Sequence, residues 1–255
     1  MSITVKDLAK MIDHSLLHPT MTDKELEEGC AMAVKYDAAS VCLKPYFVKR
    51  ATELLKGSDV MAGSVIGFPH GNSTTEIKVA ETKKACEDGA VEIDMVINIG
   101  KAMGGDWQYV KDDIKAVNEA AIAGGAILKV IFENDYLDDT TIVNLCEICN
   151  EIDVNFVKTS SGYGFVKQEN GMYNYKGATP HHLKLMRKTA KSSIQIKAAG
   201  GVRTLKDLLY VRSLGVTRIG ATATAAILDD AKKVVDSGKS LAELTPTDSD
   251  MGGGY

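Results

Sequence analysis

Short apolar runs alternate with longer amphipathic segments along most of the chain, and this pattern predicts its secondary structure. The amphipathic segments carry helix start signals, namely capping boxes at Thr22-Asp23-Lys24-Glu25 and Ser73-Thr74-Thr75-Glu76 and a threonine–proline pair at Thr179-Pro180. The apolar runs do not alternate with polar residues, so they predict buried strands of a parallel sheet that are joined by helices. The strands are expected at residues 12–17, 39–43, 60–67, 92–97, 126–132, 156–158, 194–197 and 217–220.

Eight strand–helix units within 255 residues favour a (β/α)8 TIM barrel, in the α/β class. A doubly wound open sheet is the alternative, but the chain has no GxGxxG nucleotide-binding fingerprint to support it. Only five prolines and no low-complexity run argue against a linker between domains. We therefore expect a single barrel domain over residues 1–255, with a flexible C-terminal tail at about 246–255.

Composition and charge exclude several classes of protein. A hydrophobic content of 45% and a charged content of 25% are ordinary for a soluble globular protein. The net charge of -4 gives no electrostatic footprint for nucleic acid. No apolar run is long enough to span a bilayer, and the N-terminus lacks the apolar core of a signal peptide. We therefore expect a cytoplasmic protein that binds neither nucleic acid nor membranes.

Neither the cysteines nor the histidines have the spacing of a metal site. The five cysteines are odd in number and scattered, as expected of reduced thiols. Cys146 and Cys149 have CxxC spacing but lie in a helical pattern without a second pair, so we interpret them as small hydrophobic residues of one helix face. His181 and His182 are adjacent at a helix start, where they are not expected to face one ligand. The sequence predicts no metal and no cofactor.

Two predicted strands end in a lysine that is followed at once by small residues and glycines. These stretches are Val157-Lys158-Thr159-Ser160-Ser161-Gly162 and Ile196-Lys197-Ala198-Ala199-Gly200-Gly201. A lysine must lose its proton to act as a nucleophile, and burial or a second cation lowers its pKa from about 10.4. Most lysines are solvated surface charges, but two in matching contexts indicate a Schiff-base site.

Carboxylates occupy two other predicted strands, at Asp13 and Asp94. Because chemistry gathers at the C-terminal ends of the strands in a TIM barrel, we expect both to converge with Lys158 and Lys197 at one mouth. Such a cluster can keep one lysine neutral as the nucleophile while a carboxylate moves protons. The alternative is a buried layer of ion pairs that only stabilises the barrel, although buried pairs are a poor route to stability.

Glycine turns follow the last three predicted strands. Barrels commonly bind phosphate with backbone N–H groups after the seventh and eighth strands. The alternative is that these glycines only make tight turns. We predict that the substrate or its phosphate is bound by the set Gly162, Gly200, Gly201, Gly220, Thr222 and Thr159.

Together these motifs resemble the signatures of the 2-deoxyribose-5-phosphate aldolase family. The likeness extends from about residue 10 to about residue 230. It implies a metal-independent class I aldolase that cleaves 2-deoxyribose 5-phosphate to glyceraldehyde 3-phosphate and acetaldehyde, and runs in reverse, through a lysine Schiff base. Besides the two lysine motifs, the similar stretches are Ile12-Asp13-His14-Ser15-Leu16-Leu17, Val65-Ile66-Gly67-Phe68-Pro69-His70-Gly71 and Glu92-Ile93-Asp94-Met95-Val96-Ile97-Asn98-Ile99-Gly100.

The resemblance also implies a role for each candidate catalytic residue. Lys158 is then the Schiff-base lysine, Lys197 its electrostatic neighbour and Asp94 a proton-relay carboxylate. Asp13 is implied near the substrate hydroxyls, and Tyr255 of the tail in proton transfer at C2 of the enamine. The implied partners are a phosphorylated sugar and aldehydes, with a homo-oligomer left open.

The chain departs from the family pattern in three places. Lys44 stands where an asparagine often precedes Pro45, Ala223 stands where a serine is common after Thr222, and the loop 165–176 is longer than in many members. A same-fold Schiff-base aldolase acting on another sugar phosphate is therefore the nearest alternative. A catalytically silent barrel that only binds sugar phosphates is the alternative from another class.

Overall fold

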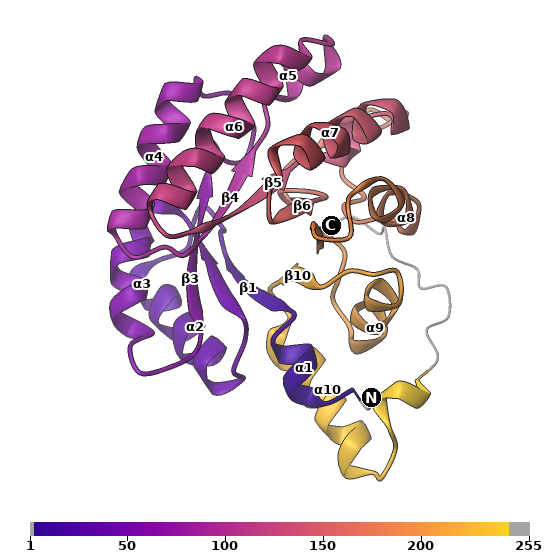
Figure 1. Cartoon of the computed structure of the whole chain (residues 1–255). Coiled ribbons are helices and arrows are strands. Elements are labelled where there is room, and N and C mark those ends of the chain that lie inside the picture. The colour runs from indigo at the N-terminus through magenta and orange to yellow at the C-terminus, as the bar shows by residue number, and fades with distance from the viewer. Residues whose placement is uncertain (1–2, 245–255) are drawn as a thin grey trace.

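In the computed structural model, which describes residues 3–244, eight parallel strands close into a barrel and helices surround it (Figure 1). Neighbouring strands follow the order β1-β10-β9-β6-β5-β4-β3-β2 around the barrel. Each predicted strand is present, and the predicted (β/α)8 TIM barrel is confirmed. The barrel strands are β1 (Ile12–Leu16), β2 (Ser40–Leu43), β3 (Met61–Ile66), β4 (Glu92–Val96), β5 (Ile127–Ile131), β6 (Phe156–Lys158), β9 (Gln195–Ala199) and β10 (Arg218–Ala221).

Helices connect the strands over the outside of the barrel (Figure 1). The described residues also form three short 3-10 helices, η1 (Pro45–Phe47), η2 (Asn134–Tyr136) and η3 (Leu241–Glu243). The predicted tail at about 246–255, with Tyr255, lies outside the described residues. The α-helices are α1 (Val5–Ala9), α2 (Asp23–Lys35), α3 (Val48–Leu54), α4 (Thr75–Glu87), α5 (Ile99–Met103), α6 (Trp107–Ala123), α7 (Asp139–Ile152), α8 (Pro180–Thr189), α9 (Leu205–Ser213) and α10 (Thr224–Asp236).

Two of the three predicted helix starts have the expected capping. Thr22 and Glu25 form the reciprocal capping box of α2, and the Thr179 side chain caps α8 with proline at its first position. The capping box predicted from Ser73 to Glu76 is wrong: α4 has Thr74 as its N-cap residue, without a side-chain cap hydrogen bond.

The alternation of side chains along each strand separates the core from the barrel interior. In β4, Ile93 and Met95 belong to the hydrophobic core, and they alternate with the buried charged residues Glu92 and Asp94. In β9, Ile196 and Ala198 lie in the core on either side of Lys197. Because successive side chains of a strand point to opposite faces, the charged residues share the inward face. The barrel therefore has an apolar outer face and a charged interior.

A two-stranded antiparallel hairpin follows β6, where the sequence predicted only a long loop. Its strands are β7 (Val166–Lys167) and β8 (Tyr173–Asn174), with Val166 opposite Asn174. The hairpin precedes α8 and lies outside the barrel sheet. Within residues 3–244, no helix is long and apolar enough to cross a membrane.

Candidate active site

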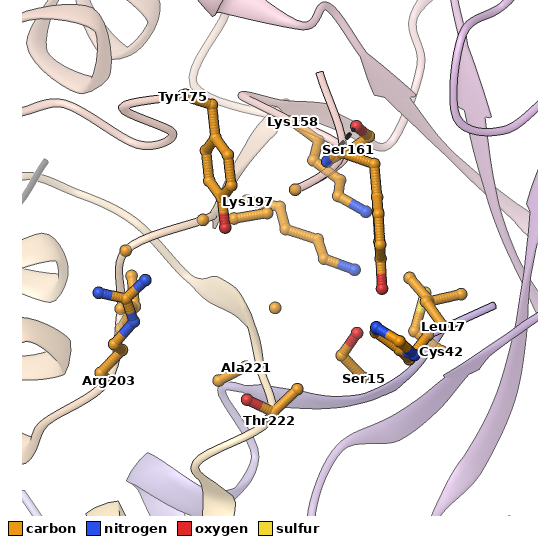
Figure 2. Close-up of a pocket in the computed structure, with 18 of the residues that line it drawn as sticks. Ser15, Leu17, Cys42, Lys158, Ser161, Tyr175, Lys197, Arg203, Ala221 and Thr222 are labelled. Carbon is orange, nitrogen blue, oxygen red and sulfur yellow. Dashed lines mark hydrogen bonds between the residues drawn. The ribbon is translucent and has the colours of Figure 1, made fainter. Parts of the chain in front are cut away.

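A cavity of about 310 Å³ opens where β6, β9 and β10 end, and the two strand-end lysines reach into it (Figure 2). Lys158 comes from β6 and Lys197 from β9, and the two residues are direct partners in the register of these strands. The glycine turns at the ends of the same strands also line the cavity, with Thr222 after β10. The structure thus brings the predicted lysines and the predicted phosphate-binding turns to one cavity.

Both lysines are held by the two predicted carboxylates. Asp94 Oδ2 lies 2.7 Å from Lys158 Nζ and 2.7 Å from Lys197 Nζ. Asp13 Oδ2 lies 2.5 Å from Lys197 Nζ. All four residues are buried, and the two carboxylates lie behind the amines rather than in the cavity lining. The convergence expected from the sequence is present, with Asp94 as the bridge between the two amines.

Sequence reasoning missed three further members of this cluster, all on inward positions of barrel strands. Lys129 of β5 contacts Asp13 at 2.8 Å and Glu92 of β4 at 2.5 Å. Arg218 of β10 contacts Asp13 at 2.6 Å and Glu92 at 2.9 Å. The available signal was a charged side chain inside each apolar run, at the spacing that points into the barrel.

The charges of the cluster balance only when one amine is neutral. Three carboxylates, Asp13, Glu92 and Asp94, face the four cationic groups of Lys129, Lys158, Lys197 and Arg218. A buried charge without a partner is costly, so the surplus cation favours release of one proton. The neighbouring Cys42 adds no charge, because burial raises the pKa of its thiol.

Lys158 is the lysine of the cluster whose pKa is lowered, so it gives up a proton more readily than Lys129 or Lys197. Burial lowers the pKa of Lys158, and the charge of Lys197 lowers it further, against the opposing effect of Asp94. Burial also acts on Lys129 and Lys197, but there Asp13 and Asp94 outweigh it and raise both pKa values. Lys197 differs from Lys158 because it contacts two carboxylates instead of one.

The carboxylates stay ionised in this arrangement. Burial acts to raise the pKa of Asp94, but Lys129, Lys158 and Lys197 hold it far below its usual range. The pKa of Asp13 is lowered in the same way, by Lys129, Lys197 and Arg218 against the effect of burial. Both carboxylates therefore serve as hydrogen-bond acceptors for the surrounding cations.

The glycine turns have backbone conformations that suit close approach of a ligand. Gly162, Gly200 and Gly201 have φ values of 86°, 80° and 89°, which other residues rarely adopt. Gly220 lies within β10, and Thr222 is exposed at the cavity. Thr159 does not line the cavity: its hydroxyl donates to Ala199 O at 3.2 Å and accepts from Ala199 N at 3.1 Å, which joins β6 to β9.

Two helices begin beside these turns. Thr204 caps α9 with its side chain, whereas Ala223 at the start of α10 provides no side-chain cap. The first N–H groups of a helix need an acceptor and favour an anion. The Ala223 that departs from the family pattern therefore leaves the start of α10 suited to an oxygen of a bound ligand.

Contrary to the expectation from the sequence, the two adjacent histidines of α8 face one common group. His181 and His182 were not expected to face one group, yet their Nε2 atoms lie 2.8 Å and 4.0 Å from the Asp139 carboxylate. Together these three residues form the one group within residues 3–244 that could hold a metal ion. They lie at the starts of α7 and α8, where the positive ends of two helix dipoles disfavour a cation.

Glu133 is a buried acid at the end of β5 that the sequence reading left without a role. Its carboxylate accepts the backbone N–H of Ser161 at 3.1 Å and 3.3 Å, next to the Schiff-base strand. A Cβ on Gly164 would lie 2.5 Å from its carboxyl carbon, so the loop packs directly on this group. Burial raises the pKa of Glu133 to about 7, although the Ser161 contacts act against this.

We expect Glu133 to make the protein less stable as the pH rises. Its folded-state pKa of about 7 lies above the ordinary value of 4.5, so the folded chain binds its proton more tightly than the unfolded chain. The stabilisation is complete below about pH 4.5 and is lost towards pH 7. Between pH 5 and pH 8, the free energy of unfolding should fall by roughly 2 to 3 kcal/mol more in the native protein than in Glu133→Gln. Urea unfolding at both pH values measures this, and parallel losses in the two proteins would contradict it.

Comparisons of the sequence and of the structure with known proteins both find aldolases. The DeoC/LacD family aldolase profile matches residues 8–233. A deoxyribose-phosphate aldolase of Rhodopirellula baltica is 47% identical over 243 residues, which are 95% of this chain and 96% of that protein. Another from Treponema denticola is 44% identical over 222 residues, 87% of this chain and 98% of that protein. The tetrameric deoxyribose phosphate aldolase structure from Aeropyrum pernix has a TM-score of 0.80 and 28% identity, covering 91% of this chain and 93% of that one.

Proposed function

The chain belongs to the DeoC/LacD family of aldolases, and from this premise we propose that it cleaves 2-deoxyribose 5-phosphate reversibly to glyceraldehyde 3-phosphate and acetaldehyde. The chain is an enzyme, a carbon–carbon lyase. The observation that carries the proposal is the buried cluster with one surplus cation, whose member Lys158 has a lowered pKa and reaches the cavity. A neutral amine at physiological pH is what a Schiff-base mechanism requires.

The first stage is formation of the imine on Lys158. Its neutral amine attacks the C1 aldehyde of the open-chain sugar and gives a carbinolamine. The carbinolamine hydroxyl leaves as water when it takes a proton, which the ammonium of Lys197 can supply across the Asp94 carboxylate that contacts both amines. The product is a protonated imine, which accepts electrons more readily than the aldehyde does.

The second stage is cleavage between C2 and C3. The C3 hydroxyl gives its proton to the amine of Lys197, which the first stage left neutral. Its oxygen becomes the carbonyl of glyceraldehyde 3-phosphate, and the electrons of the C2–C3 bond move into the iminium. An enamine of acetaldehyde remains on Lys158. Protonation of that enamine at C2 and addition of water to the imine release acetaldehyde and restore the amine.

In this proposal the other candidate residues have distinct tasks. Asp94 relays protons between the amines, and Asp13 keeps Lys197 charged through their direct contact. Tyr255 supplies the proton for C2 of the enamine, an assignment that rests on family resemblance and lies outside the described residues. Thr159 acts indirectly by joining the two lysine strands. Lys197 and Arg203 beside the glycine turns also make the cavity suited to an anion.

The phosphate is proposed to bind at the glycine turns. Gly162, Gly200 and Gly201 line the cavity with positive φ values that suit close approach of a phosphate, and Gly220 of β10 and the Thr222 hydroxyl line the cavity beside them. The uncapped start of α10 supports this position for an anion. We propose no nucleic-acid partner, because the net charge of -4 gives no electrostatic footprint for one.

Assembly and location follow from the relatives by analogy. We propose a homo-oligomer for this chain, because the Aeropyrum pernix enzyme is tetrameric. A cytoplasmic location suits an enzyme that acts on a small phosphorylated metabolite.

A substrate panel with borohydride trapping tests the proposed activity. We expect aldehyde release from 2-deoxyribose 5-phosphate to exceed release from other phosphorylated aldoses and ketoses by at least about tenfold in kcat/KM, since a site built to hydrogen-bond one substrate rejects analogues that leave its polar groups unpaired. Borohydride with acetaldehyde should add a two-carbon unit to the peptide that contains Lys158. A higher kcat/KM for another sugar phosphate would favour the alternative aldolase. Binding without imine formation would favour the silent barrel.

A further inference from the structure

The hairpin after β6 contacts the Gly200 turn, which is part of the proposed phosphate-binding site. The Asp135 carboxylate accepts the backbone N–H groups of Lys176 at 2.6 Å and Gly177 at 2.9 Å, which fixes the chain just after β8. A Cβ on Gly177 would lie 2.8 Å from the Gly200 Cα, so the two backbones are in direct contact. Ala178 N donates to Gly200 O at 3.0 Å. The hairpin therefore holds a fixed position relative to the Gly200 turn.

Tyr175 is the residue that the hairpin places at the cavity. It lines the cavity and is 4% exposed, whereas Tyr173, two residues earlier on the same hairpin, is 65% exposed. Its ring packs on Gly200, where an added Cβ would lie 3.0 Å from Tyr175 Cε2. Phe165 holds the ring from the other arm of the hairpin, with ring centroids 5.5 Å apart.

The phenol of Tyr175 points into the cavity. Figure 2 shows its hydroxyl directed inward, with Arg203 on the same side of the cavity. The amines of Lys158 and Lys197 are already held by carboxylates. Recognition of a dianion at this end therefore falls to backbone N–H groups, Arg203 and hydroxyl donors.

Building on the proposed function, we propose that Tyr175 is a specificity-determining residue, which donates its phenol hydrogen bond to a phosphate oxygen of the substrate. The hairpin then adds a third side-chain donor to the backbone of the glycine turns, beside Arg203 and Thr222. Because a charged acceptor strengthens a hydrogen bond, the loss of this donor should weaken phosphorylated ligands selectively.

The matched pair Tyr175→Phe and Tyr173→Phe tests this inference, because each removes only one hydroxyl. We expect Tyr175→Phe to lower kcat/KM for 2-deoxyribose 5-phosphate by about tenfold or more, mainly through KM, as expected for loss of a hydrogen bond to a charged group. Its kcat/KM for unphosphorylated 2-deoxyribose should stay within about twofold of the native value. Tyr173→Phe should change neither value. Gly201→Val, which strains a residue at φ 89°, provides a reference for a damaged cradle.

Equal losses on the two sugars, or no loss on either, would overturn the role of Tyr175. Two measurements separate this outcome from failure of the proposed function. Borohydride trapping of acetaldehyde, which has no phosphate, should be unchanged in Tyr175→Phe. Calorimetric binding of inorganic phosphate should weaken about tenfold in the same variant, whatever sugar the enzyme cleaves. Unchanged phosphate affinity would exclude the contact.

Discussion

Replacement of Lys158 by methionine should abolish turnover, with a loss of at least about 10⁴-fold in kcat, because the covalent route then has no amine. The change removes the one lysine of the cluster whose pKa is lowered, and it leaves three carboxylates facing three cations. The fold should therefore tolerate it. Borohydride with acetaldehyde should trap nothing on the variant at any pH, as measured by peptide mass mapping.

Lys129→Met provides the matched control for this prediction. Lys129 belongs to the same cluster and is equally buried, but it does not line the cavity. Its loss leaves three carboxylates with three cations if Lys158 keeps its proton, so the pKa of Lys158 should rise. Trapping at Lys158 should persist in this control with its pH dependence moved to higher pH. An acetaldehyde adduct on Lys197 in Lys158→Met would instead transfer the nucleophilic role to Lys197.

The barrel could be predicted from the sequence because its strands are continuous apolar runs and its helices carry local start signals. The convergence of Asp13, Asp94, Lys158 and Lys197 followed from the rule that chemistry gathers at one end of the barrel. Glu92 and Arg218 were missed because each is the first residue of its strand, at the opposite end. Their contacts depend on the register between strands distant in sequence, which no local pattern contains.

The hairpin was missed for a different physical reason. Each of its strands has only two residues, too few to show a period of two. The usable signal was the Asn170-Gly171 pair, which is typical of a hairpin turn, and Gly171 has a φ of 81°. Its position against Gly200 depends on Asp135 and Gly177, which are far from Gly200 in the sequence. The specificity role proposed for Tyr175 therefore required the structure.

Asp94→Asn should separate the relay from imine formation. The variant leaves two carboxylates with four cationic groups and removes the negative charge that Lys158 and Lys197 share. Because Asp94 raises the pKa of Lys158, its loss should lower that pKa, and trapping by borohydride should persist and extend to lower pH. Turnover should nevertheless fall by about 10²- to 10⁴-fold, the usual contribution of a general acid–base group. Steady-state kinetics and trapping on the same preparation measure both effects.

Asp113→Asn distinguishes this relay from a purely structural ion-pair layer. Asp113 and Lys78 form an equally buried pair at 2.5 Å between α6 and α4, away from the cavity. Asp113→Asn leaves the buried ammonium of Lys78 without a carboxylate, and Asp94→Asn removes a buried carboxylate that three lysines share, so both variants should lose about 3 to 5 kcal/mol in the free energy of unfolding. Only Asp94→Asn should also lose turnover at temperatures where both variants remain folded. If the two variants lost activity only in proportion to their loss of stability, Asp94 would be a structural partner of the lysines, and the proton relay would have to be assigned to another group in the cavity.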